Sequence, residues 1–293
     1  MKHDVKVTVG ICVRNAEATV GKAVESVLSQ KFPRELMEII VVDGCSEDGT
    51  LDIVKNRLGN CGIRCKIISE KEGLGRARQM VVDNARGMFI VWVDADMILS
   101  RDFLSKQVSF MEKSPKVGIA KGRYGILEDN NLVAILEDVE FALTFRYARE
   151  ANPMSLGASG SIYRVEAVRQ VGGFDKGIRG AGEDTDVENR VKANGWLLYV
   201  TSALFYEKRR NTWKSLWNEY FWHGIGASYV AGKNIRFVRL YKMLPPVAII
   251  VEFLRVPYAY KLIRKRVVLL LPLHYVFKRI AWFFGFLKGR LML

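Results

Sequence analysis

The sequence lacks a Cys-x-x-Cys pair, and its four cysteines have no second Cys or His cluster that would complete a zinc site. This absence argues against structural zinc, so we expect the cysteines to be reduced, buried thiols. The N-terminus also lacks the apolar segment of a signal peptide, because Lys2 and Asp4 lead directly into a strand-like stretch. Together these absences predict a protein of the reducing cytoplasm.

Acidic residues are nearly missing from one end of the chain. Residues 208–293 contain 17 Lys or Arg against two acids, Glu219 and Glu252. The formal net charge of +14 therefore lies in this segment, and residues 1–207 are close to neutral. We predict two domains with a boundary at residue 208. A high positive charge suggests an anionic membrane or a nucleic acid as a partner.

The basic region, 208–293, also lacks an uninterrupted run of about 20 apolar residues, which disfavours a plain transmembrane helix. We expect four prolines to break long helices: Pro245, Pro246, Pro257 and Pro272. Aromatic and aliphatic residues alternate with Lys and Arg, as in Phe277–Phe284, which is typical of helices lying on an anionic membrane surface. Short spans and a soluble, oligomerising tail are the alternatives. No nucleic acid is expected as a partner.

Strand-like and helix-like segments alternate along the first hundred residues. Predicted strands cover 5–13, 39–42, 63–69 and 88–93, and predicted helices cover 16–30, 50–58 and 76–85. This order predicts an α/β fold with a mainly parallel sheet flanked by helices. From residue 100 to 177 the regularity fades, so we expect a second half built largely of loops around one helix over 132–148. A helix ending at 194–195 and a strand over 196–200 follow.

Acidic side chains follow the predicted strands at Asp43, Asp94 and Asp96. Ligands of open parallel sheets bind beyond the carboxyl ends of the strands, so these residues should converge. If the strand continues past Asp94, both carboxylates of Asp94-Ala95-Asp96 point to one side. Such a pair suits Mg²⁺ or Mn²⁺ and a diphosphate. The alternative is that Asp-Ala-Asp only ends a strand and caps a turn.

Two further segments carry candidate ligand contacts. Arg76 and Arg78 stand at a predicted helix start, where backbone N–H groups and the helix dipole favour an anion. The alternative is that these arginines are solvated surface charge. The segment 180–186 sets three acids at the front of a helix, where Asp184 is a candidate general base. Acids in a first helical turn also stabilise the helix without any further function.

These motifs together resemble family 2 of the inverting glycosyltransferases, which has the GT-A fold, over about residues 5–230. The likeness lies in Val9–Glu17, Val41–Thr50, Gly73–Gln79, Asp94–Asp96, and Gly172–Asp175 followed by Gly182–Asp184. It implies a nucleotide-binding half over about 1–100, an acceptor half over about 101–207 and a membrane-associated region over 208–293. The donor is then a UDP- or GDP-linked sugar, the metal is Mn²⁺ or Mg²⁺, and the acceptor is lipid-linked or a glycan at the cytoplasmic face of a membrane.

The resemblance also assigns roles to individual residues. Asp184 is the catalytic base, Asp96 and Asp94 bind the metal, and His223 is a candidate diphosphate contact. Acceptor-side roles fall to Gly182, Glu183 and Ser159. Donor-binding roles fall to Val13, Asn15, Glu17, Asp43, Arg76, Asp94, Ala95 and Asp96. Two positions depart from the pattern, since Gln79 stands where Asn is usual and Phe205-Tyr206 where a His is frequent.

Other functions stay open at this point. A polyprenyl- or dolichyl-phosphate sugar synthase would use an acceptor that is already anionic and needs no strong base. A nucleotidyltransferase is disfavoured, because residues 11–19 lack its glycine-rich, arginine-containing loop. A non-catalytic membrane-binding or nucleic-acid-binding module is the alternative outside the enzymes.

Overall fold

The structure is a computed structural model that describes residues 5–127, 129–146, 155–233 and 245–292. Contacts between residues divide the chain into two compact units. The first comprises Met1–Arg123, Arg149–Arg179 and Glu183–Glu207, and the second comprises Tyr124–Ala148, Gly180–Gly182 and Lys208–Leu293.

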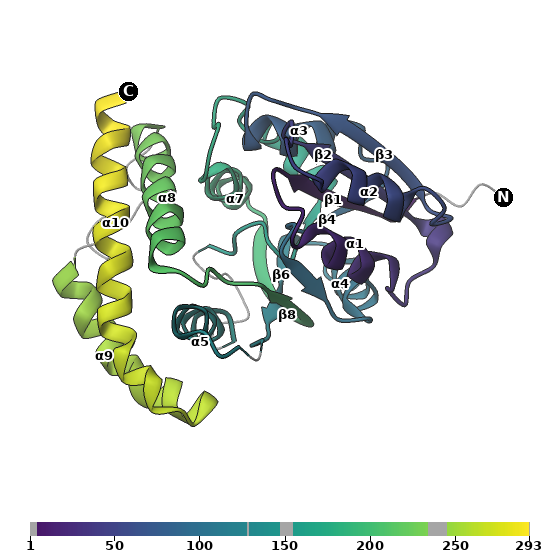
Figure 1. The fold of residues 1–293 in the computed structure, drawn as a ribbon. Helices are drawn as coiled ribbons and strands as arrows, with labels where there is room; N and C mark the ends of the chain where they lie inside the picture. The colour runs from purple at the N-terminus through teal and green to yellow at the C-terminus, as the bar shows by residue number, and fades with distance from the viewer. Residues whose placement is uncertain (1–4, 128, 147–154, 234–244, 293) are drawn as a thin grey trace. The chain divides into compact units, whose positions relative to one another are not determined.

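The first unit is built on an eight-stranded sheet with the strand order β3-β2-β1-β4-β7-β6-β8-β5 (Figure 1). Its parallel half consists of β1 (Val7–Val13), β2 (Met37–Asp43), β3 (Arg64–Ser69) and β4 (Phe89–Trp92). Antiparallel pairs complete it, with β7 (Ser161–Arg164) between β4 and β6 (Val117–Tyr124), and β5 (Met97–Leu99) against β8 (Leu197–Glu207). The predicted α/β fold is confirmed, and the sheet is mixed beyond β4.

Helices of the first unit pack their apolar faces onto this sheet. In α1 (Val20–Leu28), Val20, Ala23, Val24 and Val27 are buried, which is the spacing of one helical face. Every residue of β2 is buried, as expected for a central parallel strand. The other helices are η1 (Arg34–Leu36), α2 (Thr50–Leu58), α3 (Leu74–Asn84), α4 (Phe103–Lys113), α6 (Val165–Gln170) and α7 (Glu183–Ala193).

The expectation that residues 100–177 consist largely of loops is wrong, because α4, β6, β7 and α6 all lie within this stretch. Glycines hide the strand character of β6 in the sequence. A Cβ on Gly118 would lie 2.8 Å from the Trp196 side chain, and one on Gly122 would lie 2.6 Å from the Ala203 carbonyl oxygen. Close packing therefore selects glycine at positions where a strand would ordinarily carry β-branched residues.

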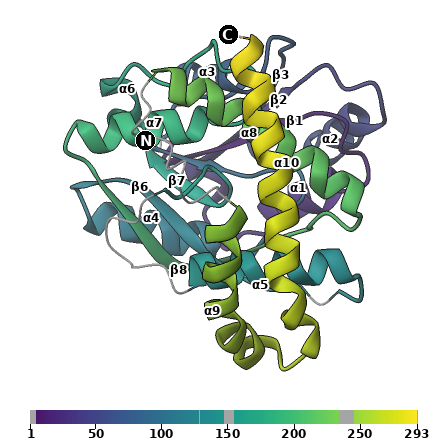
Figure 2. The same cartoon turned by 90° about the vertical axis from the view of Figure 1, so that its left-hand side faces the viewer.

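The second unit is helical, with α5 (Leu132–Arg146), α8 (Trp213–Lys233), α9 (Pro245–Ile263), η4 (Arg266–Leu270) and α10 (Leu271–Met292). Both views show α10 alongside α8 (Figures 1 and 2). We expected the prolines to break these helices, but they do not. Pro245, Pro246 and Pro272 stand in first turns, where no N–H is needed, and Pro257 is accommodated inside α9. Residues 147 and 148 of the predicted helix lie outside the described residues.

Glycines allow α8 and α10 to approach closely. A Cβ on Gly285 would lie 1.9 Å from the carbonyl oxygen of Phe221, and one on Gly224 would lie 2.0 Å from that of Trp282. Gly289, four residues after Gly285, packs against Ser228 in the same way. Small residues at this spacing let two helix backbones touch, an arrangement that is common between helices in membranes.

Charged side chains lie inside the second unit. Lys278 on α10 is fully buried and donates hydrogen bonds to Glu137 and Glu140 on α5. Glu252 and His274 are fully buried as well. Within the described part of the chain, Arg266–Met292 is the one helical stretch whose length and mean hydropathy of 1.5 suit a membrane crossing, properties that buried helices of soluble proteins share.

Candidate active site

The carboxyl ends of the parallel strands bring the predicted donor-side residues to one edge of the sheet. β1 and β2 pair so that Val13 lies opposite Asp43, and Asp43 lies opposite Ser69 of β3. Asn15 follows β1 and Asp94 follows β4, so both start from this edge. Val13 and Asp43 are buried. The arrangement is the one in which parallel sheets bind ligands.

Asn15 and Glu17 form hydrogen bonds with the loop that follows β2. The amide of Asn15 donates to the Ser46 hydroxyl oxygen at 3.0 Å, and the Glu17 carboxylate accepts from the amide of Gly49 at 2.8 Å. Ser46 in turn donates its hydroxyl to the Asp43 carboxylate at 2.6 Å. These bonds hold the two loops after β1 and β2 together, so the residues predicted to bind the donor also shape the loops that surround Asp43.

We expected the start of α3 to bind an anion, but its first N–H groups are not open. The amide of Leu74 donates to the carbonyl oxygen of Arg179 at 3.1 Å, and the amide of Gly75 donates to that of Ile178 at 3.0 Å. The approach requires glycine, because Gly73 has φ +134 and a Cβ there would lie 2.5 Å from the Arg179 Cα. The turn before residue 180 therefore occupies the N–H groups that a phosphate would need.

A pocket of about 400 Å³ opens beside this turn, lined by Arg14, Lys71, Glu72, Gly73 and Arg179. The predicted donor contact Arg76 lies next to it, with its guanidinium bonded to Glu70 at 2.9 Å and to Glu72 at 2.8 Å. Arg14 lies within the motif Val9–Glu17, whereas sequence reasoning did not assign Lys71 or Arg179 to the site. The signal in the sequence was their position, since Lys71 precedes the motif Gly73–Gln79 and Arg179 precedes the segment 180–186.

Asp94-Ala95-Asp96 forms a turn and does not continue the strand. β4 ends at Trp92, and the amide of Met97 donates to the carbonyl oxygen of Asp94 at 3.1 Å. The expectation that strand alternation aligns the two carboxylates is therefore wrong. The Asp94 carboxylate accepts a hydrogen bond from the Ser159 hydroxyl and lies 3.5 Å from the Arg78 guanidinium.

Arg78 is buried, so its interpretation as solvated surface charge is wrong. Its Nε donates to the Glu183 carboxylate at 2.7 Å, and its guanidinium lies 4.9 Å from the centre of the Trp92 ring. Burial and the Asp184 carboxylate raise the pKa of Glu183 to about 8, and Arg78 opposes that shift. Burial lowers the pKa of Arg78, but Glu183 and Asp94 outweigh it and raise that pKa above its ordinary value. At 2.7 Å, Glu183 and Arg78 form a buried ion pair.

Asp184 and Asp94 contact adjacent residues of one loop. Asp184 accepts from the amide of Ala158 at 3.1 Å and from the amide of Thr185 at 2.7 Å. The next loop residue, Ser159, donates to Asp94. The first unit thereby brings together three residues predicted separately, the candidate base, an acceptor-side serine and a candidate metal ligand.

Two predicted site residues belong to the second unit. Gly182 has φ +103, and a Cβ there would lie 2.9 Å from the Val230 side chain. His223 on α8 lies between the rings of Tyr220 and Trp222, with ring centres 5.5 and 5.9 Å away. Their predicted roles toward acceptor and diphosphate remain predictions.

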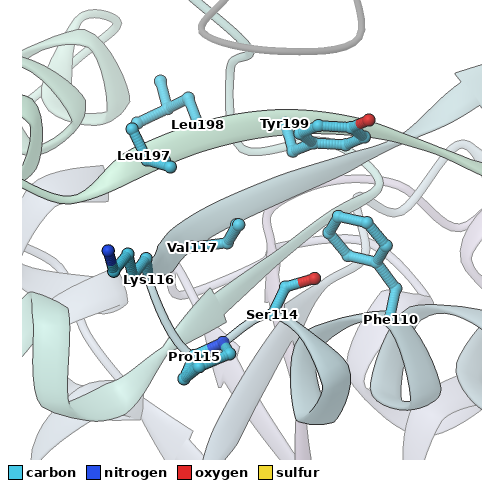
Figure 3. Close-up of a pocket in the computed structure, with 8 residues that line it drawn as sticks. All are labelled: Phe110, Ser114, Pro115, Lys116, Val117, Leu197, Leu198 and Tyr199. Carbon is cyan, nitrogen blue, oxygen red and sulfur yellow. The ribbon is translucent and has the colours of Figure 1, made fainter.

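A second pocket of about 400 Å³ in the first unit is apolar and lies at the opposite edge of the sheet (Figure 3). Its lining comes from the end of α4 and the starts of β6 and β8: Phe110, Ser114, Pro115, Lys116, Val117, Leu197, Leu198 and Tyr199. Figure 3 shows the rings of Phe110 and Tyr199 at one side of the hollow. None of the predicted site residues lines this pocket, so it is separate from the acidic cluster.

Glu137, Glu140 and His274 of the second unit lie close enough together to suggest a metal site. The Lys278 ammonium already bonds both carboxylates inside this cluster. A buried lysine that neutralises the acids leaves a cation little to gain there. We therefore regard the cluster as an ion-pair network.

Comparison with known proteins gives one family. The sequence profile described as "Glycosyl transferase family 2" matches residues 8–172, which is more than half of the chain. The putative glycosyltransferase EpsE of Bacillus subtilis is 34% identical over 115 residues, or 39% of this chain and 41% of EpsE. Poly(ribitol-phosphate) beta-N-acetylglucosaminyltransferase TarS of Staphylococcus aureus is 28% identical over 109 residues, or 37% of this chain and 19% of TarS. The chain thus matches less than half the length of these relatives.

Solved structures share the fold. The mannosyltransferase PcManGT from Pyrobaculum calidifontis, in complex with GDP-Man and Mn²⁺, aligns over 98% of this chain and 87% of its own, with a TM-score of 0.68 and 17% identity. TarS in complex with UDP-GlcNAc aligns over 98% and 92%, with a TM-score of 0.59 and 16% identity. At this identity the likeness is one of fold, and it covers the whole length of the chain.

Proposed function

This chain belongs to glycosyl transferase family 2, and we propose on that basis that it moves a sugar from a UDP- or GDP-linked donor to an acceptor hydroxyl with inversion. The observation that carries the proposal is the series of contacts from Asp184 through Ala158 and Ser159 to Asp94. A base and a metal ligand held by one short loop suit a reaction in which an acceptor attacks a metal-bound diphospho-sugar. The ligands named for PcManGT and TarS are of this class.

The donor occupies the pocket between Arg14, Lys71 and Arg179, close to Asp43. Three cations there suit a molecule that carries two phosphates. We assign catalysis to residues 1–207, with the nucleotide side in about 1–100 and the acceptor side in about 101–207.

A Mn²⁺ or Mg²⁺ ion binds at Asp96 and Asp94. The residues fit such an ion, since carboxylates at the carboxyl end of a strand offer the hard oxygens that it prefers. In this proposal Asp96 is the more direct ligand, and Asp94, which engages Ser159 and Arg78, is the second. When bound, the ion stabilises the negative charge of the departing nucleoside diphosphate.

Asp184 acts as the base. The acceptor oxygen forms a bond to the sugar C1 as the bond from C1 to the diphosphate breaks, and the hydroxyl proton passes to the Asp184 carboxylate. An aspartate suffices, because the hydroxyl becomes acidic as its oxygen bonds to an electron-poor carbon. The amides of Ala158 and Thr185 orient the carboxylate for this transfer.

Thermal-shift measurements test donor binding directly. UDP-GlcNAc or GDP-mannose with Mn²⁺ should raise the Tm of the chain, because a ligand that binds only the folded state stabilises it by about 2.7 kcal/mol at one hundred times its Kd. The same nucleotide-sugar with a chelator in place of Mn²⁺ should give a smaller shift. A Tm that neither donor moves at millimolar concentration would refute the proposal.

The second unit attaches the enzyme to the cytoplasmic face of an anionic membrane. Its polarity is reversed, with charge inside and apolar side chains outside. On α9, Glu252 is fully buried whereas Phe253 and Leu254 are 70% and 66% exposed. On α10, Lys278 is fully buried whereas Leu273 is 70% exposed. Helices of this kind suit lipid as their solvent. The basic run at 264–266 suits anionic head groups.

Attachment predicts co-flotation with lipid vesicles. The full chain should float with vesicles of phosphatidylcholine and phosphatidylserine, and the double variant Phe253→Gln/Leu254→Gln should bind at least about tenfold more weakly, because two apolar side chains leave the lipid. Met88→Gln in the first unit, where Met88 is 57% exposed, is the matched control. Equal flotation of the wild type and the double variant would contradict this attachment. The acceptor is accordingly a lipid-linked or membrane-proximal glycan.

A further inference from the structure

We propose that Lys121 is a positioning residue for Asp184: Lys121 holds the loop between Asp184 and Asp94 and supplies a positive charge that offsets the repulsion between two neighbouring carboxylates. The inference rests on the proposed function, in which Asp184 is the base. Lys121 belongs to no motif of the sequence. The signal in the sequence is a lysine in the middle of the apolar strand β6, Val117–Tyr124.

The contacts of Lys121 join it to both ends of the site. Its Nζ donates to the carbonyl oxygen of Ser159 at 2.6 Å. Ser159 donates its hydroxyl to Asp94, and the preceding amide, of Ala158, donates to Asp184. A Cβ on Gly157 would lie 3.5 Å from the Asp184 carboxylate and 3.7 Å from the Lys121 Nζ. The ammonium and the carboxylate thus converge on one glycine, whose φ of +73 favours that residue.

Burying this lysine opposes folding, so a positive charge in this position calls for a reason. Lys121 is 3% exposed, and burial lowers its pKa to about 8, against the opposing effect of carboxylates around it. Those carboxylates come from several elements: Glu207 on β8, Glu188 and Asp184 on α7, and Asp94 after β4. A buried charge that several acids surround is typical of functional sites.

Glu188 makes the positive charge necessary. It stands one helical turn after Asp184 on α7, is 2% exposed, and accepts from the Ser155 hydroxyl at 2.7 Å and the Leu156 amide at 3.0 Å. Burial, followed by the Asp184 carboxylate, raises the pKa of Glu188 to about 7. Two acids this close disfavour each other's ionised form, and Lys121 offsets the repulsion.

The expected consequence is a change in the pH dependence of turnover. Without the ammonium, the repulsion between the neighbouring carboxylates of Asp184 and Glu188 is offset less. In Lys121→Met, the rise of kcat with pH should occur at a pH about one unit higher than in the wild type. Other charges facing Asp184 stay in place: Glu183 and Glu188 on α7, Arg78 on α3, and Asp94 after β4.

The experiment measures nucleotide release from UDP-GlcNAc or GDP-mannose with Mn²⁺, using octyl glucoside as hydroxyl acceptor, for four variants of the full chain. At a pH on the ascending limb, Lys121→Met should lose roughly tenfold in kcat, with little change in the KM for donor. Lys121→Arg should keep the wild-type limb, since it keeps the charge. In the double variant Lys121→Met/Glu188→Gln, the rise of kcat with pH should return toward the wild-type pH, because the Glu188 carboxylate no longer repels Asp184. Lys116→Met, at an exposed position just before β6, is the matched control.

A double-mutant cycle in Tm supplies a readout that needs no activity. Glu188→Gln should be more stabilising in the Lys121→Met background than in the wild type, since only there does it remove an uncompensated carboxylate. An additive cycle, or a Lys121→Met enzyme with the wild-type pH profile, would overturn the inference. A wild type that turns over neither donor counts against the proposed function instead, and the cycle still decides whether Lys121 compensates the two acids.

Discussion

Replacing Asp184 with asparagine should lower sugar transfer to a hydroxyl acceptor by roughly 100- to 10,000-fold, the range that a general base contributes. Asparagine keeps a side-chain oxygen that can accept the amide of Ala158, so the loop at 157–160 stays in position. Donor binding should be nearly unchanged, because Asp184 does not line the cationic pocket. Turnover measured by nucleotide release, together with the Tm shift by donor, separates the two effects.

The control for this variant is Asp52→Asn, which makes the same chemical change at an exposed position on α2. Transfer by Asp184→Asn at the wild-type rate would exclude Asp184 as the base. A different result would change the acceptor assigned to the enzyme. If the variant fails with hydroxyl acceptors and still glycosylates a polyprenyl phosphate, the enzyme is a polyprenyl-phosphate sugar synthase, since a phosphate acceptor needs no base.

Replacing Asp96 with asparagine should remove the effect of Mn²⁺ on donor binding. An amide is a poorer ligand than a carboxylate for a hard divalent ion. Loss of metal stabilisation of the leaving diphosphate should lower transfer by roughly 100-fold or more, which corresponds to several kcal/mol of transition-state stabilisation. Calorimetric titration of UDP or GDP with and without Mn²⁺ measures the first effect, and nucleotide release measures the second.

Two further variants sharpen the metal assignment. Asp94→Asn should weaken Mn²⁺-dependent binding less than Asp96→Asn does, because Asp94 already engages Ser159 and Arg78. Asp83→Asn, on the exposed side of α3, should bind donor and metal like the wild type. An Asp96→Asn chain with undiminished Mn²⁺ dependence would contradict the assignment.

The parallel half of the sheet was predictable because local patterns dominate there. Residues 39–42 of β2 are all apolar and lead into Asp43, and helix α2 begins and ends at the residues that its periodicity predicted. Beyond residue 100, tertiary packing overrides propensity. Gly118 and Gly122 sit inside a strand because neighbouring side chains and backbone leave no room for a Cβ.

The site was predictable in its residue types and not in its contacts. Arg78 and Glu183 are 105 positions apart and form a buried pair, which no local pattern reveals. Lys121 was missed for a similar reason, since its partner Ser159 is 38 positions away. The turn at Asp94 also differs from expectation, because a hydrogen bond from Met97 outweighs the tendency of a strand to continue.

The pairing of Lys278 with Glu137 and Glu140 affects how the chain matures on the ribosome. The partners are separated by 141 and 138 positions. At about 5–20 residues per second, the two acids emerge roughly 7–30 seconds before the lysine that neutralises them. Helix α5 therefore cannot adopt its final buried environment until α10 has been synthesised, and a nascent chain that is cut short before α10 leaves the two acids without the lysine that neutralises them.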